Sequence, residues 1–237
     1  MSSSDAATDG HRPAKLSGDD ISVVMITMNE ESAVSKVLAD IQAILPGAEI
    51  VIVDSSRDRT PEIAAGFGAT VIRQFPPAGY GRAMDLALRS FTRRVGVTMD
   101  CDDTYPVDYI EPMARMVLQE GYDLVDGSRL AHKPDAMPWV NYVANAGFAL
   151  VASLLFWRRF TDLHSGMRAY RKGLMEELHC DPSGPALPVD LLLRTVRKGF
   201  RVASIFIPYR ERIGQSTMQP LASAYWTGKR ILGARFS

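Results

Sequence analysis

The stretch Val95-Gly96-Val97-Thr98-Met99-Asp100-Cys101-Asp102-Asp103-Thr104-Tyr105-Pro106 runs from an apolar segment directly into three carboxylates. A short apolar run of this kind is typical of a buried strand. Carboxylates at the exit of such a strand repel one another and lose hydration unless a cation or strong donors lie between them. In an extended chain, Asp100 and Asp102 point to the same side, where two hard oxygen ligands can share a divalent ion. The same acids also suit a solvated turn or a helix N-cap, and we expect Asp103 to cap the following helix.

Apolar runs alternate with helical patterns on both sides of this stretch. The alternation predicts an α/β fold, a Rossmann-like, mostly parallel sheet flanked by helices. Strands are expected at 21–27, 49–53, 70–73 and 95–99 and from 123, and helices at 30–45, 61–66, 81–92 and 107–119. Thr60 is expected to cap the second of these helices.

Polar side chains follow the predicted strands. Thr27 and Glu30 come after the first strand, Asp54 and Ser56 after the second, and Arg129 after the fifth. Sheets of this class bind ligands at the carboxyl ends of their strands, so we expect these groups to share one edge with the acidic stretch. Asp54 suits hydrogen bonds to a ribose or base, or, with Ser56, a cap on the next helix.

Length and composition bound the class of protein. With 237 residues and 46% hydrophobic content, the chain fits one large domain. Its 27 basic and 27 acidic residues balance, which argues against general nucleic-acid binding. Two cysteines without metal-type or redox-type spacing favour a reducing cytoplasm.

The two ends of the chain differ in character. Residues 1–20 are polar with no apolar leader segment and are expected to be a disordered lead-in, followed by a folded domain at 21–217. Residues 218–237 are expected to form a basic tail, helical and close to a membrane. From Leu193 to the C-terminus there are nine Lys or Arg against one acid, which suits anionic ligands or an anionic membrane surface.

The segment 139–157 carries no charge and approaches the length of a membrane span. Because Asn141, Asn145 and Ser153 interrupt it, we expect a buried or interface-lying helix instead of a span. The same helix is a candidate face for a homodimer.

Three loops carry further chemistry. Residues 79–83 place Gly81 before a helix, which makes this segment a candidate for a phosphate loop. In 161–168, Asp162 suits either a general base with a raised pKa or an ion pair with Arg168. Residues 210–216 place Arg212 beside a glycine, where a guanidinium can clamp a pyrophosphate, or form a solvated turn after an edge strand.

Taken in order, these segments resemble the inverting nucleotide-sugar glycosyltransferases of the GT-A fold, family 2, and among them the polyprenyl-phosphate mannose or glucose synthases. The resemblance extends from about Ile21 to about Leu221. It rests on residues 26–30, 53–60, 79–83, the Asp-x-Asp motif 100–102, and residues 127–129, 162–170 and 212–216.

The resemblance implies a metal-dependent hexosyltransferase. Its donor is a UDP- or GDP-hexose and its expected acceptor is a polyprenyl phosphate. Asp100 and Asp102 would hold Mg²⁺ or Mn²⁺ against the donor diphosphate, with Asp102 and Arg212 offsetting its charge and Arg129 positioning the acceptor. The residues that would contact the donor are Thr27, Met28, Glu30, Asp54, Ser56, Gly81, Cys101 and Ser216.

Departures from the family pattern keep alternatives open. Ile26, Met28 and Ser55 differ from it in the donor loops, and Asn141 and Asn145 stand where some relatives direct an Arg and a Ser toward the acceptor phosphate. Transfer to a small soluble or protein-linked acceptor is therefore the alternative reaction. A non-catalytic, membrane-peripheral binding protein is the alternative class. Nucleotidyl transfer is disfavoured because the loop after the first strand is acidic instead of glycine-rich and basic.

Overall fold

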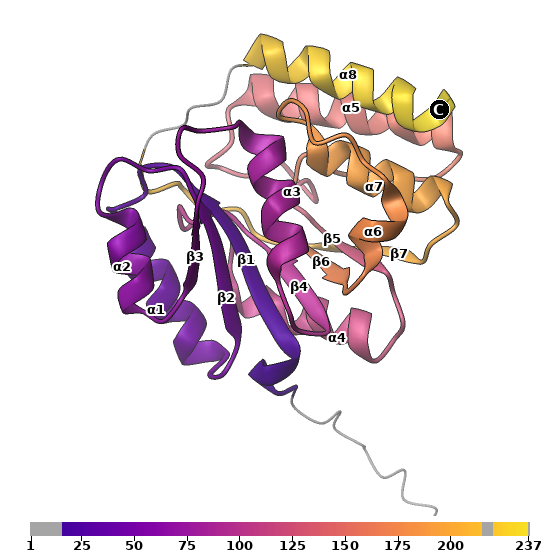
Figure 1. Cartoon of the computed structure of the whole chain (residues 1–237). Helices are drawn as coiled ribbons and strands as arrows, with labels where there is room; N and C mark the ends of the chain where they lie inside the picture. The colour runs from indigo at the N-terminus through magenta and orange to yellow at the C-terminus, as the bar shows by residue number, and fades with distance from the viewer. Residues whose placement is uncertain (1–15, 215–219, 237) are drawn as a thin grey trace, which may run out of the picture.

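The structure is a computed structural model that describes residues 16–214 and 220–236. At its centre lies a seven-stranded sheet with the order β3-β2-β1-β4-β6-β5-β7 (Figure 1). The strands are β1 (Ile21–Thr27), β2 (Glu49–Asp54), β3 (Thr70–Arg73), β4 (Val95–Thr98), β5 (Leu124–Ser128), β6 (Arg168–Arg171) and β7 (Val202–Phe206). β6 runs antiparallel to β4 and β5, and the remaining pairs are parallel. The predicted α/β fold with a mostly parallel sheet is confirmed.

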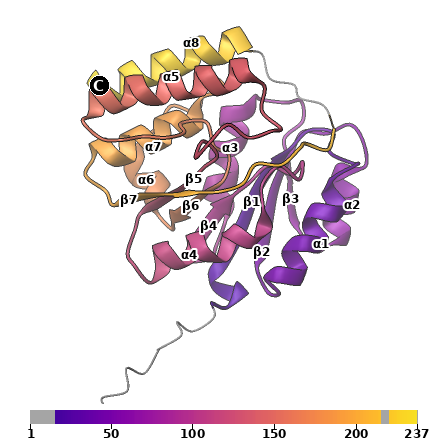
Figure 2. The same ribbon diagram turned by 180° about the vertical axis from the view of Figure 1, so that it is seen from behind.

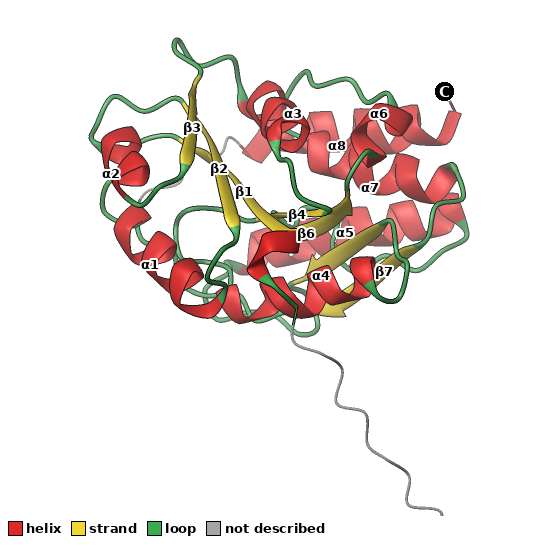
Figure 3. Ribbon diagram, turned by 60° about the horizontal axis from the view of Figure 1, so that its bottom comes forward, coloured by secondary structure: helices red, strands yellow, loops and turns green. Residues whose placement is uncertain are grey.

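Helices cover both faces of the sheet (Figure 3). One face carries α1 (Val34–Ile44), α2 (Thr60–Gly66) and α4 (Ile110–Leu118), and the other carries α3 (Tyr80–Ser90), α6 (Leu174–Leu178) and α7 (Leu187–Arg197). Two longer helices, α5 (Trp139–Phe156) and α8 (Pro220–Phe236), lie side by side as an outer layer over α7 (Figures 1 and 2).

The core divides in two because side chains of the central strands alternate between the faces. Val23 and Met25 of β1 join the cluster beneath α1 and α4. Val24 joins the cluster beneath α3 and α7. With both faces covered, the polar loops at the carboxyl ends of the strands are left for binding and chemistry.

Several predicted boundaries shift by a few residues. α1 begins at Val34 instead of 30, and α2 begins at Thr60 itself. Thr60 is therefore not the helix cap that we expected. Asp58 Oδ1 takes that role in part, accepting from Thr60 N at 3.0 Å.

The ends of the chain also correct the predicted domain limits. Gly18–Asp20 form a short 3₁₀ helix, with Ser17 Oγ accepting from Asp19 N at 3.2 Å, so ordered structure begins before Ile21. The last segment is helical as predicted, but α8 is not a tail, because Ile231 and Ala234 are buried in the core cluster shared with α7.

The apolar helix α5 is exposed. Only Ala149 and Ala152 of α5 are buried, and 11% of its 18 residues lie inside the protein. The buried placement is therefore wrong, whereas the interfacial one is compatible with this exposure. With a mean hydropathy of 1.5, α5 passes a length and composition test for a membrane span, alone among the described helices.

Candidate active site

The candidate site lies where the carboxyl ends of β1, β2, β4 and β5 meet. β6 is antiparallel, so its beginning, with the loop 161–167, reaches the same edge. The segment after β7 crosses this edge (Figure 2). There Arg210 N donates to Thr104 O at 3.0 Å and Ile213 N donates to Asp102 O at 2.9 Å.

The acidic knot, formed by Asp100, Asp102 and Asp103, occupies the middle of this edge. Asp102 Oδ1 accepts from Thr104 N and Thr104 Oγ1 at 3.1 and 2.6 Å, and its Oδ2 accepts from Arg212 Nη2 at 2.7 Å. The predicted Arg212 is thus brought onto the predicted Asp102.

Asp103 does not cap a helix. Its φ is +64°, and its Oδ1 accepts from Lys36 Nζ at 2.8 Å. The 3₁₀ helix Val107–Tyr109 that follows begins after Pro106 without a side-chain cap. Asp103 instead joins the knot to α1, which corrects our expectation.

The knot brings several carboxyl groups close together. Residues 101–103 bend, so the alternation of an extended strand does not explain their layout. Burial raises the pKa of Asp100 to about 6, with repulsion from Asp102 adding to the effect and Arg129 and Arg212 opposing it. Burial also raises the pKa of Glu30 to about 7; Arg212 opposes this shift and the knot carboxylates reinforce it. Both carboxyl groups therefore resist ionisation, chiefly because they are buried and also because the neighbouring carboxylates repel them.

The donor set fits Mg²⁺ or Mn²⁺. Within residues 16–214 and 220–236, Asp100 makes no hydrogen bond or ion pair, so its oxygens are available. No cluster of three or more His, Cys, Asp or Glu suited to a metal is found in these ranges. Two carboxylates completed by water and phosphate oxygens are an ordinary set for Mg²⁺. Arg212 Nε is buried without a hydrogen-bond partner among the described residues, which leaves a donor for an anion beside the knot.

A buried ion pair lies next to the knot. Arg129 Nε and Nη2 donate to the two oxygens of Asp162 at 2.7 and 3.0 Å, and the guanidinium carbon lies 5.2 Å from the Tyr209 ring centroid. Burial disfavours the charged form of Asp162. The Arg129 guanidinium and the backbone N–H of His164 stabilise that form more strongly, so the pKa of Asp162 falls to about 2. A general base needs the opposite shift. Asp162 therefore orients Arg129 in this structure.

Arg168 has a different partner from the one that we expected. Its Nε donates to Asp126 Oδ1 at 2.6 Å, and both side chains are buried. The register of β5 with β6 pairs these two residues directly, so the predicted Asp162–Arg168 pair is wrong. Asp126 was missed, although a carboxylate inside an otherwise apolar strand signals a buried partner.

Thr27, Asp54 and Ser56 come together as predicted, but they bind one another. Asp54 Oδ2 accepts from Thr27 Oγ1 and Ser56 Oγ, both at 2.6 Å, and its Oδ1 accepts from Arg73. All three predicted residues are at most 4% exposed. Ser56 Oγ also accepts from Asn29 N at 2.8 Å, so this cluster joins the loops that follow β1 and β2. Asp54 is not a helix cap.

The other residues predicted to contact the donor differ in exposure and packing. Met28 is 39% exposed at the edge of the site. Cys101 is buried in the core cluster, and this burial raises the pKa of its thiol. A Cβ on Gly81 would lie 2.3 Å from Pro182 O; the glycine permits close packing there instead of forming a phosphate cradle. Ser216 lies outside the described residues.

Two tyrosines of the site were not predicted. Tyr105 is buried beneath the knot, and its hydroxyl accepts from Gly166 N at 2.7 Å, which fixes the loop before β6. Tyr209 packs edge-on against it, with ring centroids 5.8 Å apart. Aromatic residues next to charged loop residues were the available signal.

Comparison with known proteins agrees with this geometry. The chain is 44% identical over 215 residues, 90% of its length, to the dolichyl-phosphate hexose transferase of Haloferax volcanii, and covers 93% of that protein. It is 26% identical to the polyprenol monophosphomannose synthase of Mycolicibacterium smegmatis, over 88% of this chain and 85% of that one.

A solved structure with the same fold is glucosyl-3-phosphoglycerate synthase from Mycobacterium tuberculosis, in complex with Mn²⁺, UDP and glucosyl-3-phosphoglycerate. The TM-score is 0.73 at 22% identity, over 91% of this chain and 79% of that one. The family model for glycosyl transferase family 2 matches residues 22–179. The chain is a glycosyltransferase and belongs to glycosyl transferase family 2.

Proposed function

We propose that this protein transfers a hexose, with inversion, from a nucleotide diphosphate sugar to a polyprenyl phosphate. The observation that carries the proposal is the meeting of two unlike sites at one sheet edge. An acidic knot with Arg212 lies beside a buried arginine, Arg129, that is held by Asp162. The 44% identity to a dolichyl-phosphate hexose transferase supports the choice of acceptor.

The knot is the donor side. Asp100 and Asp102 would hold Mg²⁺ or Mn²⁺, which supplies positive charge to offset the charge that develops on the leaving diphosphate. Arg212 adds a second cation from the segment after β7. Its Nη2 already lies 2.7 Å from Asp102, and its unpaired Nε can donate to a phosphate oxygen. Glu30 and the loops fixed by Asp54 border the nucleoside position.

Arg129 is the acceptor side. Its two-pronged contact with Asp162 holds the guanidinium plane, while the Tyr209 ring covers one face of it. An ionised phosphate is already a nucleophile and needs no strong general base. The low pKa of Asp162 therefore favours a phosphate acceptor over a hydroxyl acceptor that would rely on Asp162.

A transfer assay tests this proposal. Purified protein is mixed with Mg²⁺ or Mn²⁺, a radiolabelled UDP- or GDP-hexose and detergent-dispersed polyprenyl phosphate. We expect label to enter the organic phase with polyprenyl phosphate but not with the unphosphorylated polyprenol. The Asp102→Asn variant is the matched control, and we expect it to lose this transfer. Transfer to a water-soluble acceptor alone, or to none with any donor, would contradict the proposal.

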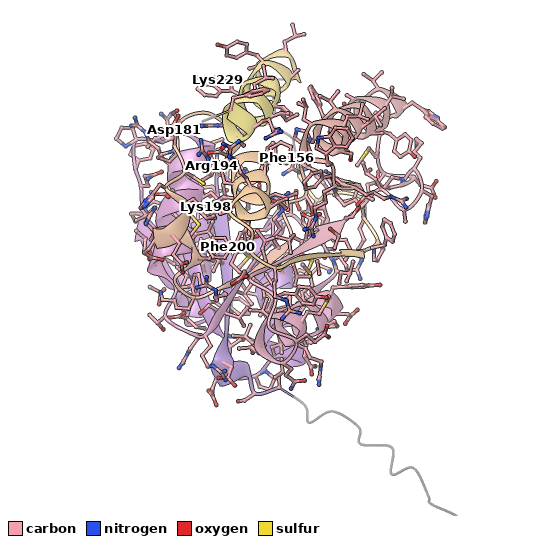
Figure 4. The ribbon with its side chains drawn as sticks, turned by 90° about the vertical axis from the view of Figure 1, so that its right-hand side faces the viewer. Phe156, Asp181, Arg194, Lys198, Phe200 and Lys229 are labelled. Atoms are coloured by element: carbon pink, nitrogen blue, oxygen red, sulfur yellow. The ribbon has the colours of Figure 1, made fainter. Side chains whose placement is uncertain are left out.

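We also propose that the protein works at a membrane surface. α5 and α8 carry large exposed apolar residues, among them Val140 (79%), Leu154 (66%) and Leu221 (88%). No acidic residue occurs in 136–161 or in 212–237. The exposed Arg158 and Arg159 follow the end of α5, and the exposed Lys229 lies on α8 (Figure 4). A two-fold dimer would bring these like charges together, while an anionic bilayer complements them.

Vesicle sedimentation distinguishes membrane binding from dimerisation. We expect more protein to pellet with anionic than with neutral vesicles, and less after Leu154→Ser. A stable dimer in light scattering, together with no pelleting, would favour the homodimer instead. The cytoplasmic location stays a prediction.

A further inference from the structure

The imidazole of His164 lies between the candidate site and the outer helical layer formed by α5 and α8. Its ring centroid is 5.7 Å from that of Phe148 on α5. Its Nε2 lies 2.8 Å from Thr227 Oγ1 on α8. The ring therefore contacts both of the helices that lie side by side in Figures 1 and 2, while its backbone belongs to the loop before β6.

The hydrogen bond between His164 and Thr227 has a defined direction. Thr227 Oγ1 donates its hydrogen to Ser223 O at 2.8 Å, one turn earlier in α8, so it can only accept from the imidazole. His164 Nε2 is therefore the protonated nitrogen. Burial lowers the pKa of His164 to about 4, against the opposing effect of Asp162, so the ring is neutral near pH 7. Its Nδ1 is buried with no hydrogen-bond partner among the described residues, where a second ring proton would be left unsatisfied.

The backbone of His164 reaches the acceptor side directly. Its N–H donates to Asp162 Oδ1 at 2.9 Å, and the same oxygen accepts from Arg129 Nη2 at 3.0 Å. A displacement of the His164 backbone therefore moves the carboxylate that orients Arg129. A continuous path of hydrogen bonds thus joins Thr227 of α8 to the guanidinium through two residues.

Other contacts of α8 hold this helix in place without His164. Arg230 Nη2 donates to Asp181 O at 2.8 Å, and its Nη1 donates to Asp181 Oδ2 at 3.2 Å. A Cβ on Gly184 would lie 2.5 Å from the Trp226 ring, so this glycine lets the indole pack closely on the loop before α7. Because these contacts fix α8 on its own neighbours, Thr227 offers the imidazole a stationary acceptor.

We propose that His164 is a positioning residue for the acceptor phosphate, and that it fixes the Asp162–Arg129 pair against α8 through Thr227. The inference rests on the proposed function, in which Arg129 binds that phosphate. It gives α8 a part in sugar transfer that the helix exerts only through His164. A histidine that merely packs would need neither the Thr227 hydroxyl nor one tautomer. A buried hydrogen bond, by contrast, selects a single placement of the loop.

A set of threonine variants tests the proposal. Thr227→Val removes the hydroxyl that accepts from His164 with little change of volume, and Thr227→Ser keeps it. Thr195→Val on α7 is the matched control. Thr195 is equally buried, and its Oγ1 donates to Leu191 O at 2.6 Å, the same kind of bond within a helix. It makes no hydrogen bond to a histidine among the residues that the structure describes. Each variant is assayed with Mn²⁺, labelled donor and detergent-dispersed polyprenyl phosphate.

We expect Thr227→Val to lower kcat/KM for polyprenyl phosphate about tenfold, chiefly through a higher KM, since a full 1 Å misplacement of a positioning group can cost about a hundredfold. The KM for the donor stays unchanged, and so does the rise in melting temperature caused by Mn²⁺ with a nucleoside diphosphate. Thr227→Ser keeps the natural acceptor KM, and Thr195→Val changes neither KM. A Thr227→Ser variant as impaired as Thr227→Val would overturn the proposal.

A double-mutant cycle shows whether the two side chains act together. His164→Phe keeps an aromatic ring against Phe148 but removes the Nε2 donor. Combined with Thr227→Val, it should raise the acceptor KM no more than either change alone, whereas effects that multiply would overturn the link. If melting curves show that Thr227→Val does not fold, His164→Gln is compared with His164→Phe. The Gln amide can still donate to Thr227, so only His164→Phe should raise the acceptor KM.

A stability measurement separates this link from the underlying function. If the unmodified protein transfers no sugar to polyprenyl phosphate, the proposed function fails, and melting temperatures still test the link. Thr227→Val should lower the melting temperature less in the Asp162→Asn background than in the natural protein, because the path that it supports is already broken there. Equal decreases in the two backgrounds would overturn the positioning role of His164.

Discussion

Replacing Asp162 with Asn removes the charge that holds Arg129 while keeping the volume of the side chain. Asp162 is fully buried, and its pKa is about 2 against an ordinary value of 3.8. That difference corresponds to about 2–3 kcal/mol of stability at neutral pH. Leaving Arg129 buried without its counter-charge acts in the same direction. For a chain of this length, we expect the melting temperature to fall by about 5–10 °C.

The pH dependence gives this prediction its sign. A carboxyl whose pKa is lowered by folding contributes its full stabilisation above the unfolded pKa and loses it as pH falls through the folded pKa. The gap in melting temperature between the natural protein and Asp162→Asn should therefore be constant from pH 8 to about pH 5. It should shrink below about pH 4, as Asp162 of the unfolded chain becomes protonated. Differential scanning fluorimetry over this range measures both features.

Asp40→Asn is the control. Asp40 is exposed and pairs with Lys36 one helical turn away at 2.9 Å, so its loss should cost less than about 0.5 kcal/mol. Asp162→Asn should also lose sugar transfer while keeping the stabilisation by nucleoside diphosphate and metal, because the donor side is separate. A variant as stable as the natural protein at pH 7, or a gap that disappears between pH 8 and pH 5, would refute the reasoning.

Three further outcomes are expected. Mn²⁺ with a nucleoside diphosphate should raise the melting temperature more than either alone, and Asp102→Asn should abolish this difference. Ionised, half-buried Glu30 destabilises the metal-free protein. The free energy of unfolding of the natural protein, relative to that of Glu30→Gln, should therefore fall as pH rises from about 4.5 to 7. The loss is about 1–2 kcal/mol after allowance for solvent screening, measured by urea titration at several pH values. Arg168→Met leaves Asp126 buried without its partner and should cost about 3–5 kcal/mol in the same titration, whereas Arg94→Met, at an exposed pair, should cost under about 1 kcal/mol.

The fold was predictable because β1, β2 and β4 are buried on both faces and read as apolar runs. The strand β6 was missed for an equally physical reason. It begins and ends with Arg168 and Arg171, which find carboxylate partners across the sheet, at Asp126 and Asp123. Charges paired through tertiary contacts hide a buried strand from any local pattern. The exposure of α5 was not predictable either, since an apolar segment looks the same against protein or against lipid.

The site was predictable as a set of loops but not as a set of contacts. The positions of Asp102, Arg129 and Arg212 at one edge follow from where strands end. Which carboxylate binds which arginine depends on strand register, so Asp162 was assigned the wrong partner. The cluster around Asp54 shows the same limit, because the sequence does not tell whether a carboxylate meets a ligand or satisfies its own neighbours.

The carboxylates gathered at the knot constrain how the sugar-nucleotide donor binds. Arg212 reaches both Asp102 and Glu30, at 2.7 and 3.8 Å, yet the pKa of Glu30 is still raised to about 7. A nucleoside diphosphate adds further negative charge at this place, so Coulomb repulsion opposes its binding alone. A metal cation bound by Asp100 and Asp102 would relieve that repulsion and free Arg212 to contact the phosphates. Metal and diphosphate should therefore each raise the affinity of the other by the same factor, as linkage requires. Calorimetric titrations in the two orders of addition should close this cycle, and independent binding of the two ligands would mean that Arg212 alone neutralises the donor.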